Sequence, residues 1–124
     1  MTDPIEGLTA ILPCNDLDAS EAFYARLGFR RTDGETGGTY RRLADGHGGR
    51  LHLTDAVEGW LTPGRNPFGL YLYREDVDAV AASVAEIRLD APAEREWGMY
   101  EFALSDPDET LVRVGWPTRL RTPA

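Results

Sequence analysis

The feature that most constrains the fold is a four-residue pattern that occurs twice. Asp16-Leu17-Asp18-Ala19 recurs sixty residues later as Asp76-Val77-Asp78-Ala79. In both places an apolar run precedes the pattern and apolar residues at helical spacing follow it, with the first aspartate where a helix N-cap is expected. Because a strand–helix unit that repeats at a fixed distance indicates a duplicated module, we predict two similar halves.

The first half predicts one strand, one helix and three further strands. The segment from Leu17 to Leu27 gathers its larger apolar residues on one side at helical spacing, and Gly28 follows where a left-handed residue ends many helices. Turn-rich segments separate the strands, which we expect at Leu8 to Cys14, Phe29 to Thr32, Tyr40 to Ala44 and Arg50 to Thr54.

The second half repeats this plan after a loop that contains prolines and glycines. A strand at Leu70 to Tyr73 leads to a helix that is capped by Asp76 and carries apolar residues three and four apart as far as Ile87. The remaining strands are expected at Arg88 to Ala93, Met99 to Leu104 and Thr110 to Val114.

The expected fold class is therefore α+β, with two tandem βαβββ modules at about residues 5–56 and 67–116 joined by a loop. A chain of 124 residues is long enough for one hydrophobic core and too short for two independent ones. We therefore expect residues 1–124 to form a single domain.

Charge and cysteine content exclude several kinds of partner and site. Twenty-one acidic residues against thirteen basic ones give a net charge of −8, which disfavours nucleic acid as a partner. The single cysteine, Cys14, excludes an intramolecular disulfide and a cysteine-based zinc cluster, and we expect a buried, inert thiol. The first residues lack the pattern of a signal peptide and no stretch approaches membrane-span length, so we expect a cytoplasmic protein without a membrane partner.

Several motifs point to a known family. Near the amino terminus they are Asp16-Leu17-Asp18-Ala19-Ser20, Phe23-Tyr24 and Leu27-Gly28-Phe29, and near the carboxy terminus they are Trp97-Gly98, Glu101-Phe102-Ala103-Leu104, Asp106-Pro107-Asp108 and Leu111-Val112-Arg113. The first group resembles the vicinal-oxygen-chelate superfamily, which includes glyoxalase I, extradiol dioxygenases and bleomycin-resistance proteins. The second group is similar to the bleomycin-resistance branch. The resemblance implies a homodimer with ligand clefts at its interface, and Glu109 departs from it because the family usually has glycine in that turn.

The resemblance also provides a test for a metal site. Metal-dependent members place one ligand, typically His or Glu, on each of four strands, and these positions correspond here to Thr9, His52, Leu70 and Arg113, with the third fixed to within one residue. Leu70 has no lone pair, and the guanidinium of Arg113 is permanently cationic. Since only His52 is a suitable ligand, we expect no metal and no cofactor.

Catalytic groups are weakly indicated elsewhere. His52 is a candidate base or ligand contact, and a lone histidine on a strand is more typical of a hydrogen-bonding residue. No Gly-x-Ser-x-Gly elbow exposes a serine, so a hydrolase is not expected. The enzyme alternatives are a lactoylglutathione-lyase or dioxygenase relative with displaced ligands and a metal-independent isomerase that uses His52.

We predict a non-catalytic protein that binds a small molecule in a cleft, as the resemblance to drug-sequestering bleomycin-resistance proteins implies. Strand alternation directs His52, Thr54 and Arg113 into the cleft, and large aromatic residues in loops are favoured where flat ligands stack. Acidic turn residues complement a cationic ligand. The candidate ligand-binding residues are Asp33, Glu35, Tyr40, His52, Thr54, Trp60, Phe68, Leu70, Trp97 and Arg113. Trp60 is equally consistent with a core cap or dimer contact, and an endogenous metabolite is an alternative ligand.

Overall fold

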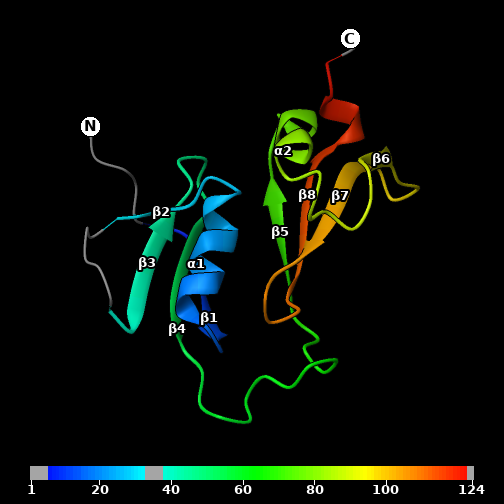
Figure 1. Ribbon diagram of the computed structural model, residues 1–124. Helices are drawn as coiled ribbons and strands as arrows, with labels where there is room; N and C mark the ends of the chain where they lie inside the picture. The colour runs from blue at the N-terminus through cyan, green and yellow to red at the C-terminus, as the bar shows by residue number, and fades with distance from the viewer. Residues whose placement is uncertain (1–5, 33–37, 123–124) are drawn as a thin grey trace.

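The structure, a computed structural model, describes residues 6–32 and 38–122, which form two four-stranded sheets with one helix beside each (Figure 1). The first module contains β1 (Ala10–Cys14), α1 (Leu17–Ala25), β2 (Arg30–Arg31), β3 (Tyr40–Ala44) and β4 (Arg50–Asp55). The second contains β5 (Gly69–Tyr73), α2 (Val77–Ser83), β6 (Ala93–Glu94), β7 (Met99–Ser105) and β8 (Leu111–Pro117), followed by a 3-10 turn, η1 (Thr118–Leu120).

The two sheets have the same topology. Their strand orders are β1-β4-β3-β2 and β5-β8-β7-β6. In each sheet the first strand of the module pairs in parallel with the last, and the other pairs are antiparallel. Two tandem βαβββ modules are therefore confirmed. The strand expected between Arg88 and Ala93 is shorter than predicted, because β6 starts only at Ala93 and Arg88 makes an isolated bridge to Leu104.

The two helices differ at their starts, although the sequence pattern is the same. Asp16 caps α1 as predicted, since its side chain accepts the amide hydrogen of Ala19 at 3.1 Å. Asp76 does not cap α2 with its side chain, because Arg74 donates to both of its carboxylate oxygens at 2.9 and 2.8 Å. Asp76 therefore occupies the predicted N-cap position of α2 without making a capping hydrogen bond, and α2 ends at Ser83 rather than continuing to Ile87.

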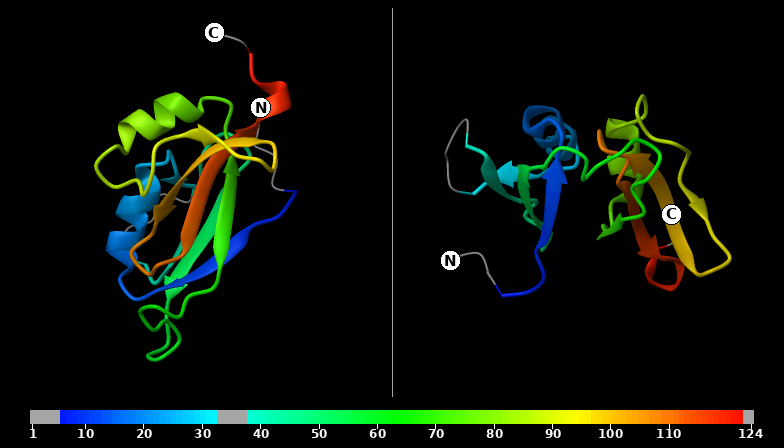
Figure 2. Two further views of the ribbon diagram at one scale, coloured as in Figure 1. Left: turned by 90° about the vertical axis from the view of Figure 1, so that its right-hand side faces the viewer. Right: turned by 90° about the horizontal axis from the view of Figure 1, so that it is seen from below.

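Both helices lie on the same side of the two sheets, so no helix formed by the described residues covers the opposite sheet faces (Figure 2). The core forms between the helices and the covered faces. Strand alternation buries Leu51 and Leu53 of β4 and Val112 and Val114 of β8, all at most 3% exposed, as the sequence predicted. No helix in the described ranges has the length and apolar character needed to cross a membrane.

The modules are joined by polar contacts as well as by the core. The hydroxyl of Tyr24 on α1 donates to Oδ2 of Asp106, in the turn between β7 and β8, at 2.7 Å. Arg26, just beyond α1, forms an ion pair with Glu86 at 2.9 Å.

Cys14 is 2% exposed, which confirms the expected buried thiol, and burial raises the pKa of this thiol to about 11.

Candidate functional site

The uncovered face of the first sheet, here called open face A, carries His52. Register pairs Tyr40 with Thr54 and Arg42 with His52 between β3 and β4, so these four side chains share this face. The hydroxyl of Tyr40 lies 2.8 Å from Nδ1 of His52, and the two rings meet edge to face with centroids 5.2 Å apart. Three predicted cleft residues, Tyr40, His52 and Thr54, are therefore brought together.

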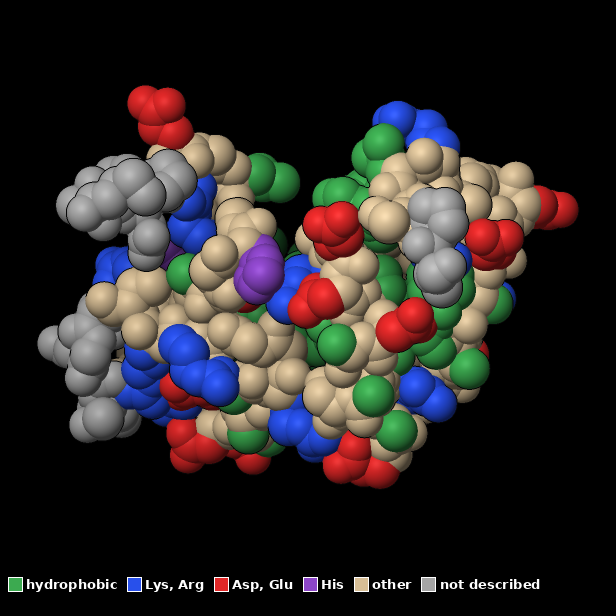
Figure 3. Space-filling model, turned by 90° about the horizontal axis from the view of Figure 1, so that it is seen from above, with side chains coloured by type: hydrophobic (Ala, Val, Ile, Leu, Met, Phe, Trp, Pro, Cys, Tyr) green, Lys and Arg blue, Asp and Glu red, His purple; other side chains and the backbone are tan. Residues whose placement is uncertain are grey.

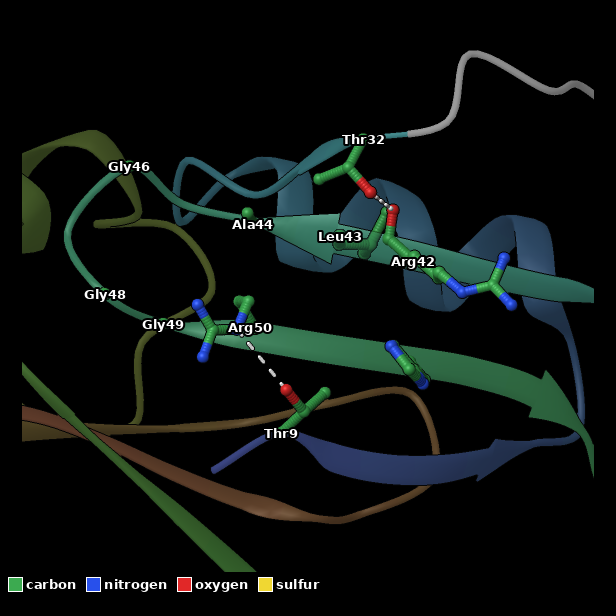
Figure 4. Close-up of a pocket in the computed structure, with 10 residues that line it drawn as sticks. Thr9, Thr32, Arg42, Leu43, Ala44, Gly46, Gly48, Gly49 and Arg50 are labelled. Atoms are coloured by element: carbon green, nitrogen blue, oxygen red, sulfur yellow. Dashed lines mark hydrogen bonds between the residues drawn. The ribbon is translucent and has the colours of Figure 1, made fainter. Parts of the chain in front are cut away.

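A pocket of about 530 Å³ lies on open face A at the end nearest the β3–β4 hairpin (Figure 4). Its polar lining comes from β3, from β4, from the approach to β1 and from the residue that follows β2, and the hairpin glycines form one rim. Nε of Arg50 donates to Oγ1 of Thr9 at 3.4 Å across this pocket. The polar residues that line it are Thr9, Thr32, Arg42, Arg50 and His52.

The uncovered face of the second sheet, open face B, has a buried carboxylate at its centre. Glu101 of β7 is only 3% exposed, and it accepts hydrogen bonds from the hydroxyl of Tyr71 at 2.7 Å and from Nη1 of Arg113 at 3.3 Å. Burial, followed by the hydrogen bond to Glu101, raises the pKa of Tyr71 well above its ordinary value. Tyr71 is therefore a neutral donor here and not a base.

Trp97 lies beside this carboxylate in the turn that leads into β7. Its indole Nε1 donates to Oε1 of Glu101 at 3.3 Å, and the guanidinium carbon of Arg113 lies 5.9 Å from its ring centroid. The residue is nevertheless 56% exposed and lines a pocket of about 600 Å³ together with Met99, Pro117 and other residues. Trp97 thus presents a tethered aromatic surface to solvent.

Leu70 was placed wrongly by the sequence prediction. It pairs with Val112 and packs against the core, whereas Tyr71 pairs with Arg113 and faces the open side. Because side chains alternate along a strand, a shift of one residue moves a side chain to the other face of the sheet. Tyr71 therefore replaces Leu70 in the candidate site.

The other predicted residues are not gathered at the two open faces. Trp60 and Phe68 lie in the loop between the modules, where they are 62% and 72% exposed, and neither lines the pockets on the open faces. Asp33 and Glu35 lie outside the described residues, so the acidic rim remains a prediction.

The four positions at which the family's metal-dependent members hold a metal do not suit one in this chain. With Tyr71 in place of Leu70, they are Thr9, His52, Tyr71 and Arg113. The tyrosine hydroxyl is engaged with Glu101, and the guanidinium of Arg113 repels a cation. Within residues 6–32 and 38–122, no three His, Cys, Asp or Glu side chains are grouped closely enough to hold a metal ion.

Sequence reasoning missed Glu101 as a functional candidate. The available signal was a charged residue inside the otherwise uncharged strand Met99–Ser105, at a position that alternation assigns to the uncovered face.

A space-filling view shows a hollow between the two halves of the molecule, with hydrophobic side chains along its walls (Figure 3). The open faces are thus exposed surfaces with aromatic and charged groups in defined positions.

Comparison with known proteins identifies the family to which this chain is related. Residues 7–114 match the family model of the Glyoxalase/Bleomycin resistance protein/Dioxygenase superfamily. A bleomycin resistance protein from Klebsiella pneumoniae is 32% identical, and the match covers 86% of this chain and 88% of that protein.

Two solved structures share the fold closely. A bleomycin-binding protein in complex with bleomycin superposes with a TM-score of 0.73 at 29% identity, covering 90% of this chain and 98% of that one. A bleomycin resistance determinant encoded on transposon Tn5 gives a TM-score of 0.74 at 28% identity, with the same coverage of both chains. The match of the family model over most of the sequence, and the duplicated βαβββ fold, lead to one conclusion: this chain belongs to the glyoxalase/bleomycin resistance protein/dioxygenase superfamily.

Proposed function

We propose that this chain is a non-catalytic binding protein that sequesters a bleomycin-type glycopeptide. The observation that carries the proposal is Trp97, which is exposed beside a pocket and held at its indole nitrogen by a buried carboxylate. A flat aromatic surface in a fixed position is suited to stacking on a planar ligand. The relatives named for bleomycin resistance and bleomycin binding give the ligand class.

Binding without catalysis is consistent with the chemistry of the described residues. Burial raises the pKa of the Cys14 thiol to about 11, so the thiol is not a nucleophile at neutral pH. Tyr71 is a hydrogen-bond donor with a raised pKa, and Arg113 is paired with Glu101 at 3.3 Å. Sequestration requires none of these groups to react, because stoichiometric binding alone keeps a drug from its target.

The ligand contacts divide between the two open faces. We assign His52, Thr54 and Tyr40 to polar contacts from open face A, and Trp97 and Arg113 to stacking contacts from open face B. The exposed rings of Trp60 and Phe68 are assigned to secondary contacts through the loop between the modules. Preference for a cationic ligand rests on Asp33 and Glu35, whereas preference for a planar ligand rests on Trp97.

We further propose a homodimer that acts in the cytoplasm. Exposed apolar side chains support the dimer, since Ile11 on open face A and Tyr73 on open face B are 59% and 58% exposed. A free buried cysteine is consistent with a reducing compartment. Light scattering should give about twice the 13.7 kDa chain mass at micromolar concentration, and a stable monomer would contradict the dimer.

A drug titration tests the proposed function. Bleomycin should quench tryptophan fluorescence in a saturable way, and Trp97→Ala should weaken binding by about 2 kcal/mol, roughly thirtyfold, the scale of a hot-spot aromatic residue. Leu89→Ala, which removes another exposed apolar side chain, is the matched control and should leave affinity unchanged. A folded protein that shows no saturable quench at about 100 µM drug would refute drug sequestration, since that concentration exceeds the micromolar Kd of even modest complexes.

A further inference from the structure

Glu101 lies on open face B, which no helix of the described residues covers, yet it is only 3% exposed to solvent. It lies opposite Gly115 in the antiparallel register of β7 and β8. A Cβ atom at Gly115 would lie 2.7 Å from Cβ of Glu101 and would collide with the hydroxyl of Tyr71. Glycine at this position therefore leaves the space in which the tyrosine hydroxyl reaches the carboxylate.

Three donors from three separate segments converge on this carboxylate. Tyr71 of β5 and Trp97 of the preceding turn both donate to Oε1, at 2.7 and 3.3 Å, and Arg113 of β8 donates to Oε2 at 3.3 Å. A buried carboxylate is stable only when its charge and lone pairs are satisfied in this way. The same three hydrogen bonds that stabilise the carboxylate of Glu101 therefore also hold the side chains of Tyr71, Trp97 and Arg113 in place.

The consequence is greatest for Trp97. An exposed tryptophan in a turn ordinarily exchanges between rotamers, and ordering such a side chain on binding costs conformational entropy. Here the indole nitrogen is tethered and the guanidinium of Arg113 lies near the ring, so the aromatic surface is ordered before any ligand arrives.

We propose that Glu101 is the positioning residue of the ligand site. It holds Trp97 and Arg113 in the geometry that accepts a planar aromatic group, and it neutralises Arg113 so that the stacking surface carries little net charge. This inference rests on the proposed function for its ligand, but the ordering of Trp97 is a property of the protein alone and is testable without one.

The ligand-free test uses 5-fluorotryptophan incorporated into the full chain and ¹⁹F NMR. The resonance of Trp97 is identified as the one missing from Trp97→Phe. In Glu101→Ala it should move toward the shift of a solvent-exposed tryptophan, whereas Glu101→Gln, which keeps a carbonyl acceptor, should retain most of the native shift. Glu96→Ala removes an exposed carboxylate next to Trp97 in sequence and should change nothing. If Glu101→Ala does not fold, Glu101→Met keeps the volume and removes both oxygen acceptors.

The binding test is a double-mutant cycle with bleomycin. Glu101→Ala should weaken binding about tenfold in the native background and by only about threefold in Trp97→Ala, because most of the contribution of Glu101 passes through the indole ring and only its contact with Arg113 remains in that background. Additive losses, or a Trp97 resonance that is the same in Glu101→Ala and native protein, would overturn the inference. If native protein does not bind bleomycin, the proposed function fails, while the NMR comparison still decides whether Glu101 positions Trp97.

Discussion

Removal of one hydroxyl at the junction of the two modules should destabilise the whole domain. Tyr24 is fully buried, and its hydroxyl donates at 2.7 Å to Oδ2 of Asp106, which is itself 6% exposed. In Tyr24→Phe, Oδ1 of Asp106 keeps the amide hydrogens of Asp108 and Thr110 at 2.8 and 2.9 Å, but Oδ2 loses the tyrosine donor in a site that water does not readily enter. Hydrogen bonds to charged groups contribute about 1.5–3 kcal/mol, so we expect a loss of about 2 kcal/mol.

Urea unfolding followed by circular dichroism measures this loss. With a slope of about 2 kcal/mol per molar urea, typical of a small domain, the midpoint should fall by about 1 M. The transition should stay single, because the hydrogen bond joins modules that share one core. Tyr73→Phe removes a hydroxyl from a side chain that is 58% exposed and should change stability by less than about 0.5 kcal/mol. Equal midpoints for Tyr24→Phe and native protein would refute this reasoning.

Two further changes follow from local geometry. Glu109 has a φ of 67°, in the left-handed region that glycine adopts without strain. Glu109→Gly should therefore raise the unfolding free energy by about 1 kcal/mol and the melting temperature by about 4 °C, although the variant loses the contact with the amide of Gly64. A melting temperature below that of native protein would contradict this prediction. Burial raises the pKa of Cys14 from 9.0 to about 11, so its contribution to stability is fully present below pH 9 and is lost as the pH rises through 11. Unfolding free energies measured from pH 9 to 11 should therefore fall less steeply in Cys14→Ala, and equal slopes would count against the assigned pKa.

The fold could be predicted from sequence because it depends on periodic patterns. The repeated aspartate pattern, the apolar helix faces and the alternation of β4 and β8 are local signals, and the structure places Leu53 and Val114 in the core as alternation requires. Asp76 shows the limit of such signals. An aspartate caps α1 at position 16, but the aspartate at the matching position 76 pairs with Arg74, because the neighbouring guanidinium competes for its carboxylate.

The candidate site was less predictable because it depends on register and on contacts between distant residues. A shift of one residue exchanged Leu70 for Tyr71 at the open face. Glu101 contacts residues 30 positions before it and 12 after it, and no local pattern indicates that these side chains meet. Trp97 was predicted to contact the ligand from its aromatic character and from the family resemblance, but the hydrogen bond that orders it becomes visible only when β5, β7 and β8 are assembled.

Calorimetric titration of metal-free bleomycin into chelator-treated protein tests the central claim most directly. If the chain sequesters the drug without a metal, the titration should show saturable binding, with one drug bound per chain and an affinity unchanged by the chelator. The metal content of the same sample, measured by elemental analysis, should be far below one ion per chain. Binding that appears only after a divalent metal is added, together with about one metal per chain that is lost in His52→Ala, would contradict the claim and indicate a metal-dependent member of the family.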